Sequence, residues 1–240
     1  MSFVVSTIRT ALFYGLLSLW TIFFPTLCFL VIGFFPYKKR HKLLAKNWSL
    51  VSIYLCRVIC GVRWEVHGKE NIPDKGCVII SNHQSTWETF FLQTLLTPQT
   101  QVLKKELLSI PFFGWALRSI KPIAIDRKDP LGALQRIKRQ GLSSLKKGVS
   151  VLIFPEGTRS HPGKVGKFSR GGAGLACSAG VDILPIAHNA GHHWPKDRWT
   201  KTPGTIHVHI GPVITTEDKG PAAANNQARD WVENTLAKYY

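Results

Sequence analysis

The sequence predicts an α/β fold, a mostly parallel sheet with helices on both faces, plus an N-terminal membrane-binding helical element. Two observations predict it. From Val62 onward, short apolar or alternating runs typical of strands alternate with longer segments typical of helices. Before Val62, the chain holds a long uncharged apolar segment. Its 240 residues are enough for one domain and an appended element, and we expect these at 61–240 and 1–60.

The apolar segment spans residues 11–37 and is followed at once by Lys38, Lys39 and Arg40. It is long enough to cross a bilayer, which takes about 20 apolar residues. Pro25 lies inside it, which leaves open one span or two short helices that enter one leaflet as a hairpin. A secretory signal fits less well, because the segment is too long and lacks a small-residue cleavage site. We therefore expect membrane attachment.

The charge of the chain indicates an anionic partner. The formal net charge is +17, from 31 Lys and Arg against 14 Asp and Glu. Nucleic acid, an anionic membrane surface and a phosphorylated substrate would each suit this balance. The apolar segment decides against nucleic acid, which does not require it. The basic residues that follow the segment are typical of a cytoplasmic flank beside anionic head groups. They are Lys38, Lys39, Arg40, Lys42 and Lys46.

The first elements after the apolar segment are a helix at 43–60 and a strand at 62–66. Alternation of Val62, Trp64 and Val66 is typical of a half-buried strand. The run "CVIIS" at 77–81 is continuously apolar, as expected of a strand that is covered on both faces.

The remaining elements follow by the same patterns. We predict further strands at 100–104, 122–126, 149–154, 181–187 and 204–211. We predict further helices at 85–96, 111–118 and 130–147, from the glycine-rich stretch 170–174, and at 222–238.

Polar side chains follow four of the predicted strands where those strands end. They are His83, Lys104, Asp126 with Arg127, and Glu156. Ligands of open parallel sheets bind outside the carboxyl ends of the strands. Because four such ends would meet at one edge of the sheet, we expect a functional site there.

The stretch "NHQSTWETF" holds a histidine and a carboxylate five positions apart, His83 and Glu88. A catalytic pair is one interpretation. The other is a capping box, in which Glu88 bonds back to the backbone N–H of Ser85 and has no further role. Five positions on a continuous helix point about 140° apart. A pair therefore requires His83 in the preceding loop and Glu88 in the first helical turn.

Four motifs occur in a fixed order: "NHQSTWE", "PFFGWALRSIKPIAIDR", "FPEGTRS" and "ILPIA". Together they resemble the four sequence blocks of the glycerolipid acyltransferases, especially the bacterial 1-acylglycerol-3-phosphate acyltransferases. The resemblance covers about residues 76–190. It departs from the family in one place, because the first block is His-x4-Asp in the family and carries Glu88 here.

The resemblance implies transfer of a fatty acyl group from acyl-CoA or acyl carrier protein to the sn-2 hydroxyl of lysophosphatidic acid. Phosphatidic acid would form at the cytoplasmic face of the bacterial inner membrane, with an anionic membrane as partner. The thioester is a co-substrate, and neither a cofactor nor a metal is implied. Another lyso-lipid, such as lyso-ornithine lipid, or glycerol-3-phosphate remains an alternative acceptor. A non-catalytic basic membrane-binding protein is the alternative from another class.

The resemblance also implies roles for the site residues. His83 would be the general base, which a poorly nucleophilic alcohol needs, and Glu88 would orient it and stabilise the imidazolium. No G-x-S-x-G motif is present, so we expect direct attack without an acyl-enzyme.

The phosphate of the acceptor would be held by Arg127 and Arg159, because a guanidinium donates two parallel bonds to an anion. Glu156 would bind the acceptor or order the arginine, and Gly157 would allow a tight turn. Lys104 is a candidate third cation.

Two ordinary explanations compete with these roles. Arg127 could form a salt bridge with Asp126 or Asp129, and Glu156 with Arg159 could be a local ion pair worth only tenths of a kcal/mol.

The remaining histidines and cysteines indicate no ligand set. His207 and His209 alternate with apolar residues and so face one side of a strand, and His192 and His193 resemble no known ligand set either. The five cysteines contain no C-x-x-C pair, so we predict neither a disulfide framework nor a zinc site from them.

Overall fold

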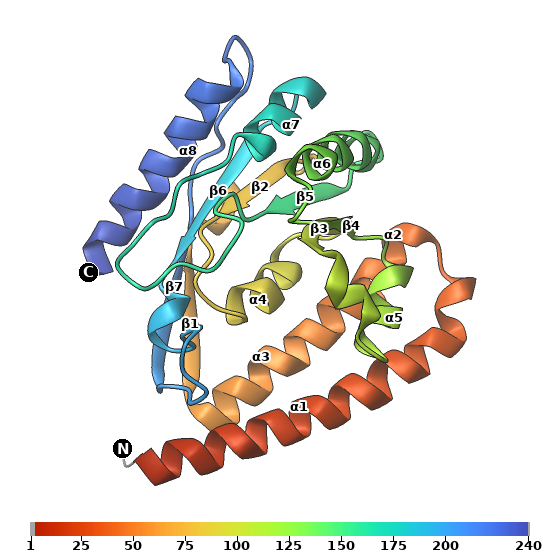
Figure 1. The fold of residues 1–240 in the computed structure, drawn as a ribbon, viewed down its shortest axis with the longest axis vertical. Coiled ribbons are helices and arrows are strands. Elements are labelled where there is room, and N and C mark those ends of the chain that lie inside the picture. The colour runs from red at the N-terminus through yellow and green to blue at the C-terminus, as the bar shows by residue number, and fades with distance from the viewer. Residues whose placement is uncertain (1–2, 240) are drawn as a thin grey trace.

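A computed structural model describes residues 3–239, and the side chains of all of these except 30, 37 and 38. Its sheet has seven strands in the order β1-β7-β6-β2-β5-β3-β4, and helices lie on both faces (Figure 1). The strands are β1 (Val62–His67), β2 (Val78–Ser81), β3 (Gln99–Lys104), β4 (Ile123–Ile125), β5 (Ser150–Ile153), β6 (Ile183–His188) and β7 (Gly204–Ile210). The helices are α1 (Phe3–Val31), α2 (Tyr37–Arg40), α3 (Asn47–Cys60), α4 (Trp87–Leu95), α5 (Phe113–Ser119), α6 (Pro130–Leu145), α7 (Gly171–Ala179) and α8 (Pro221–Leu236).

Every strand pair is parallel except β6 with β7. The predicted fold class, a mostly parallel sheet between helices, is therefore confirmed. Because β6 and β7 run in opposite directions, the carboxyl ends of β2, β3, β4, β5 and β6 share one edge of the sheet. The carboxyl ends of β1 and β7 lie at the opposite edge.

The apolar run in β2 is continuous because both faces of the sheet are covered. Cys77 and Ile79 pack in the cluster that contains residues of α1, α3 and α4. Val78 and Ile80 pack in the cluster that contains residues of α6, α7 and α8. Successive side chains of a strand point to opposite faces, so neither face of β2 can be polar.

Helix α1 is continuous through Pro25, so the split into two short helices is wrong. Proline in a helix interior removes one hydrogen bond and costs about 3 kcal/mol. Packing contacts before and after Pro25 stabilise the continuous helix. Before the proline, Trp20 stacks on Phe24 with ring centroids 4.4 Å apart. After it, Cys28 and Ile32 are buried in a cluster with residues of α5.

The hairpin that does form pairs α1 with α3, with α2 and a π-helix (His41–Lys46) at the turn (Figure 1). Two tryptophans join the helices. The indole of Trp48 donates to the Thr21 hydroxyl at 3.2 Å, and the indole of Trp20 donates to the Trp48 carbonyl at 3.3 Å. Farther along α1, Phe13 is completely buried in the core beside Trp194. Helix α1 is thus part of the folded core.

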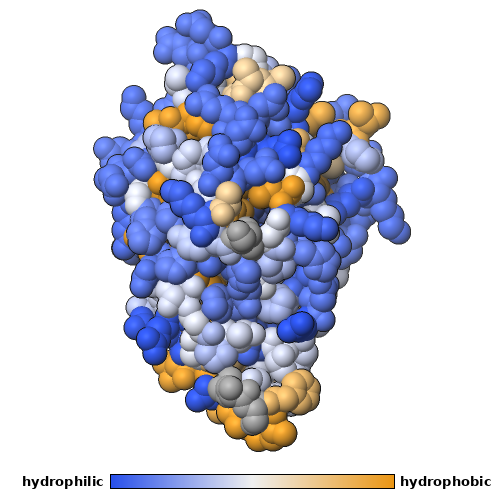
Figure 2. All heavy atoms as spheres, turned by 90° about the vertical axis from the view of Figure 1, so that its left-hand side faces the viewer, coloured by the Kyte–Doolittle hydropathy of each residue, from blue (hydrophilic) through white to orange (hydrophobic). Residues whose placement is uncertain are grey.

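The outer side of α1 is apolar and exposed. Two segments, Phe3–Phe29 and His41–Cys60, are long and apolar enough to cross a membrane by length and composition. Figure 2 shows a mostly hydrophilic face on the α8 side, with hydrophobic residues gathered at its lower end, where α1 begins. The exposed apolar side chains of α1 include Phe3, Ile8, Leu12, Leu19, Phe23, Leu27 and Phe29.

Candidate active site

The loop after β2 and the start of α4 bring His83 and Glu88 together. His83 Nδ1 lies 2.8 Å from Glu88 Oε1, and the Glu88 side chain is completely buried. The same oxygen accepts the backbone N–H groups of Gln84 at 3.0 Å and Ser85 at 2.8 Å. Glu88 therefore makes both the predicted pair and the predicted capping bond. The helix begins at Trp87, two residues later than predicted, and the Trp87 N–H donates to the Ser85 hydroxyl.

The charge on Glu88 sets which ring nitrogen of His83 faces it as a hydrogen-bond donor. Burial acts to raise the pKa of Glu88, but His188, His83 and the Ser85 N–H outweigh it and hold that pKa below its usual range. An ionised carboxylate can only accept hydrogen bonds. His83 Nδ1 must then carry the hydrogen, which leaves the lone pair on Nε2. The ring is fixed by Phe154, whose centroid is 4.4 Å away in a stacked arrangement. The geometry suits a general base.

Glu156, at the carboxyl end of β5, fixes the backbone of His83. Its Oε1 accepts the His83 N–H at 2.6 Å, and its Oε2 accepts the Gly166 N–H at 2.8 Å. The Ser160 N–H donates in turn to the His83 carbonyl at 2.7 Å. Burial raises the pKa of Glu156, although these N–H donors oppose the rise. No ion pair joins Glu156 to Arg159 in the described residues, so the local-ion-pair explanation is wrong.

Gly157 occupies a backbone conformation that favours glycine, with φ +69°. A Cβ built there would meet no atom within 4 Å. The requirement is therefore conformational rather than spatial, as expected for a tight turn after β5.

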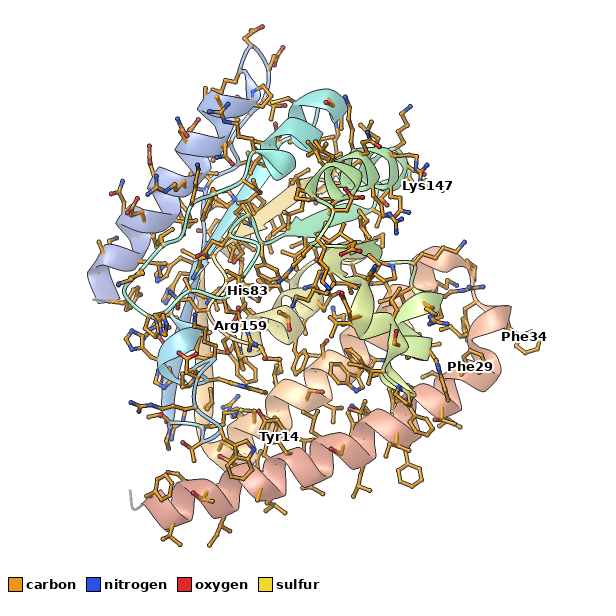
Figure 3. All side chains as sticks on the ribbon, viewed as in Figure 1. Tyr14, Phe29, Phe34, His83, Lys147 and Arg159 are labelled. Carbon is orange, nitrogen blue, oxygen red and sulfur yellow. The ribbon has the colours of Figure 1, made fainter. Side chains whose placement is uncertain are left out.

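Arg159 lies beside the His83 loop, as Figure 3 shows. Its Nη1 donates to the Thr86 hydroxyl at 3.2 Å, and its carbonyl accepts from Lys196 Nζ at 2.7 Å. In the part of the chain that the structure describes, its guanidinium has no acidic partner. The arrangement leaves donors available for an anion next to the proposed base.

Arg127 also lacks an ion pair or hydrogen bond to any described residue. Asp126 is engaged with Lys105 Nζ at 2.5 Å, and Asp129 caps α6 by accepting the Gly132 N–H at 2.9 Å. The salt-bridge explanation for Arg127 is therefore wrong.

The surroundings of Arg127 favour an anion. Burial lowers its pKa, and the positive charge of Arg159 lowers it further, against the opposing effect of Glu106. Two guanidinium groups within range of each other's charge, neither with an ion pair in the described residues, attract an anion such as phosphate.

Lys104 is not brought into this group. It is exposed at the end of β3, and no hydrogen bond or ion pair joins it to another described residue. Its neighbour Lys105 is the residue that pairs with Asp126. A direct role for Lys104 at His83 finds no support in the geometry.

Sequence reasoning missed a buried polar pair behind the site, Asn82 and His188. The Asn82 side chain exchanges two hydrogen bonds of 3.0 Å with the His188 backbone, and His188 Nε2 lies 2.9 Å from the Asn82 carbonyl. That carbonyl can only accept, so Nε2 carries the hydrogen. Burial lowers the pKa of His188. His188 ends β6 at the same sheet edge, so the rule that found His83 could have found it.

An apolar pocket lies between α1, α3, α4, α5 and β3. Thr89 and Phe90 of α4, next to Glu88, are part of its wall. Serine, threonine and glutamine side chains supply the polar atoms in an otherwise hydrophobic surface. The other lining residues include Pro25, Leu44, Trp48, Gln93, Gln101, Leu103, Phe113, Ala116 and Leu117.

Comparisons with known proteins relate this chain to acyltransferases. A family model described as "Acyltransferase" matches residues 63–189. A 1-acyl-sn-glycerol-3-phosphate acyltransferase of Pseudomonas aeruginosa is 54% identical over 237 residues, 98% of this chain and 92% of that protein. The corresponding alpha enzyme of Mus musculus is 31% identical and covers 75% of this chain and 67% of its own length. A crystal structure of the 1-acyl-sn-glycerophosphate acyltransferase of Thermotoga maritima shares the fold, with a TM-score of 0.84 and 24% identity. The match covers 99% of this chain and 97% of that one.

Proposed function

The chain belongs to the acyltransferase family, and on that premise we propose that it acylates lysophosphatidic acid at the sn-2 hydroxyl to give phosphatidic acid. The names of the Pseudomonas and mouse relatives support this acceptor. The observation that carries the proposal is the contact of 2.8 Å between His83 Nδ1 and the buried carboxylate of Glu88. It leaves Nε2 as the base.

The reaction follows from that tautomer. Nε2 of His83 takes the proton of the sn-2 hydroxyl while the oxygen attacks the thioester carbonyl, and Glu88 stabilises the imidazolium that forms. The tetrahedral intermediate then expels the thiolate and leaves a new oxygen ester. The imidazolium returns its proton to the thiolate, so the enzyme ends as it began. Base catalysis of this kind contributes about 10²–10⁴-fold, and it calls for neither a metal nor a further cofactor.

The two substrates have separate places in this proposal. Arg127 and Arg159 bind the phosphate of the acceptor, and Glu156 and Gly157 shape the loop that presents Arg159. The apolar pocket whose wall includes Thr89 and Phe90 takes the fatty acyl chain of the donor, because this wall is mostly hydrophobic. Either acyl-CoA or acyl carrier protein could deliver that chain, and both are anionic thioesters that suit a chain with net charge +17.

The membrane brings the acceptor to the site. Helix α1 packs along α3 and α5, so it cannot leave the protein to cross a bilayer alone. Its exposed apolar side lies instead in one leaflet, parallel to the surface. We place this leaflet at the cytoplasmic face of the bacterial inner membrane. The basic residues at the turn would meet anionic head groups there. They are Lys39, Arg40, Lys42 and Lys46, with the side chain of Lys38 outside the described residues.

A product assay tests the function. The full chain, purified in detergent micelles, is supplied with lysophosphatidic acid, lyso-ornithine lipid or glycerol-3-phosphate, each with acyl-CoA or acyl carrier protein thioester. Phosphatidic acid should form and should continue to form in EDTA, and His83→Ala should abolish it. Product from another acceptor alone would reassign the substrate. Membrane binding without any product would indicate a non-catalytic protein.

A further inference from the structure

Four polar side chains form a cluster on β1 and β7, toward the carboxyl ends of these two strands. These ends lie on the opposite side of the sheet from the carboxyl end of β2. Strands β1 and β7 pair in parallel, with Glu65 opposite His207 and His67 opposite His209. Side chains two residues apart in a strand share a face, so the four form a square on one face. Tyr239, which follows α8, adjoins it, with its hydroxyl 2.5 Å from His209 Nε2.

Three of these side chains converge. Glu65 Oε2 lies 3.5 Å from His207 Nδ1 and 4.0 Å from His67 Nε2, and one ligand atom from each of the three residues lies within 4.8 Å of the other two. We propose that Glu65, His67 and His207 bind a divalent transition-metal ion of the zinc class. Ligands 2.0–2.1 Å from a tetrahedral ion are about 3.4 Å apart. One of the contacts already has this spacing. Rotation of two exposed side chains closes the others.

The ligand types select the class of ion. Two imidazoles and one carboxylate suit Zn²⁺ and its neighbours Co²⁺ and Ni²⁺, whereas Mg²⁺ and Ca²⁺ prefer oxygen ligands throughout. Water completes the fourth position. His209 is a positioning residue, because its ring stacks on His67 with centroids 4.7 Å apart and is itself held by Tyr239.

The ion would cross-link β1 to β7. In the described residues β1 pairs with β7 alone, so it is an edge strand held by one ladder. A metal bridge from Glu65 and His67 to His207 would tie it to β7 a second time. Because His83 follows the carboxyl end of β2, at the other edge, the ion takes no part in acyl transfer.

Metal titration tests the site without reference to activity. The full chain, free of any histidine tag, is stripped with EDTA, returned to detergent buffer and titrated with Zn²⁺ by calorimetry. Co²⁺ absorption reports the coordination number. We expect one equivalent per chain and a higher melting temperature with Zn²⁺, because an ion that binds only the folded state stabilises it. Glu65→Gln, His67→Ala and His207→Ala should each weaken binding at least about 10-fold.

The controls place the ion. His192→Ala removes an exposed histidine outside the cluster, and His83→Ala removes the proposed base. Both should bind Zn²⁺ as the unmodified chain does. The proposal is overturned if no saturable equivalent binds. It is equally overturned if Glu65→Gln and His67→Ala both keep full affinity while the protein remains folded by circular dichroism.

Discussion

One oxygen of Glu88 accepts the ring N–H of His83 and the backbone N–H of Ser85, each at 2.8 Å. The same carboxylate therefore makes both the predicted capping bond and the proposed catalytic pair, which are not alternatives. The capping bond positions the Glu88 carboxylate, and the position of this carboxylate determines the tautomer of His83. A substitution that separates charge from hydrogen bonding is needed to divide the two roles.

Glu88→Gln makes that separation. The amide oxygen can still accept all three N–H groups, so the helix start should persist. Stability should fall by about 1–3 kcal/mol, because the amide N–H₂ would take the place of Oε2, which is buried without a hydrogen-bond partner in the described residues. The neutral amide cannot stabilise an imidazolium, so kcat should fall on the order of 10³–10⁴-fold. The measurement is kcat and melting temperature of the same preparation.

Ser85→Ala is the matched control. It removes the hydroxyl that accepts the Trp87 N–H but keeps the Ser85 N–H for Glu88. Stability should drop by about 1 kcal/mol with kcat nearly unchanged. Near-normal turnover in Glu88→Gln would assign Glu88 to the helix start alone and leave His83 as an unassisted base.

Arg159→Ala should raise the KM for lysophosphatidic acid or lower kcat/KM, with the KM for the thioester nearly unchanged. Charge-assisted hydrogen bonds of about 1.5–3 kcal/mol correspond to roughly 10–150-fold. Initial rates at varied concentrations of each substrate measure this.

Lys147→Ala removes an equal charge far from the site (Figure 3) and should have no such effect. If Arg159→Lys retains full activity, a single positive charge suffices and the bidentate contact of Arg159 with the phosphate is unnecessary.

The exposed side of α1 can be tested by making it polar. Leu19, Phe23 and Leu27 lie four residues apart on that side, each more than half exposed. Glutamate at all three should release the protein from neutral vesicles in a sedimentation assay, since apolar burial drives insertion.

Phe13→Ala serves as the control for these exposed positions, because Phe13 lies on the buried side of α1. It should cost about 3–5 kcal/mol of stability, because Phe13 is completely buried, and should leave vesicle binding of the folded protein unchanged. Equal retention of the triple variant on neutral vesicles at high salt would refute the proposed membrane face.

His188 should make stability fall in mild acid. Burial lowers its pKa, His83 adds to this, and Glu88 and the Asn82 carbonyl oppose it. An unfolded histidine takes up its proton near pH 6.5, before folded His188 does. Below about that pH the unfolded state binds more protons, so stability decreases as pH falls.

His188→Gln should flatten this dependence. The contribution is at most about 1.4 kcal/mol per pH unit, or about 2–4 °C of melting temperature per kcal/mol for a chain of this size. Melting temperatures at about pH 7.5 and about pH 5.5 for both proteins give the comparison. An unchanged difference between the two pH values would show that His188 is protonated in the folded state or contributes nothing.

Local patterns were sufficient to predict the elements and to place most residues of the candidate site at one edge of the sheet. Seven strands appeared near their predicted ranges, because alternation and apolar runs report burial within a few residues of the chain. His83, Arg127 and Glu156 were identified as strand-end residues, because parallel strands align their carboxyl ends whatever their order in the sheet. The contact between His83 and Glu88 could also be predicted from the sequence, since both residues lie in one nine-residue stretch.

Only the tertiary structure decided the contacts between distant parts of the chain. Glu156 binds the His83 N–H across 73 residues, and nothing local distinguishes that partner from Arg159, three residues away. The continuity of α1 through Pro25 depends on packing against α3 and α5, which a local proline penalty does not include. His67 and His207 meet because β1 pairs with β7 in one register. Strand order and register come from the packing of the whole chain, so side chains far apart in sequence acquire their neighbours only on folding.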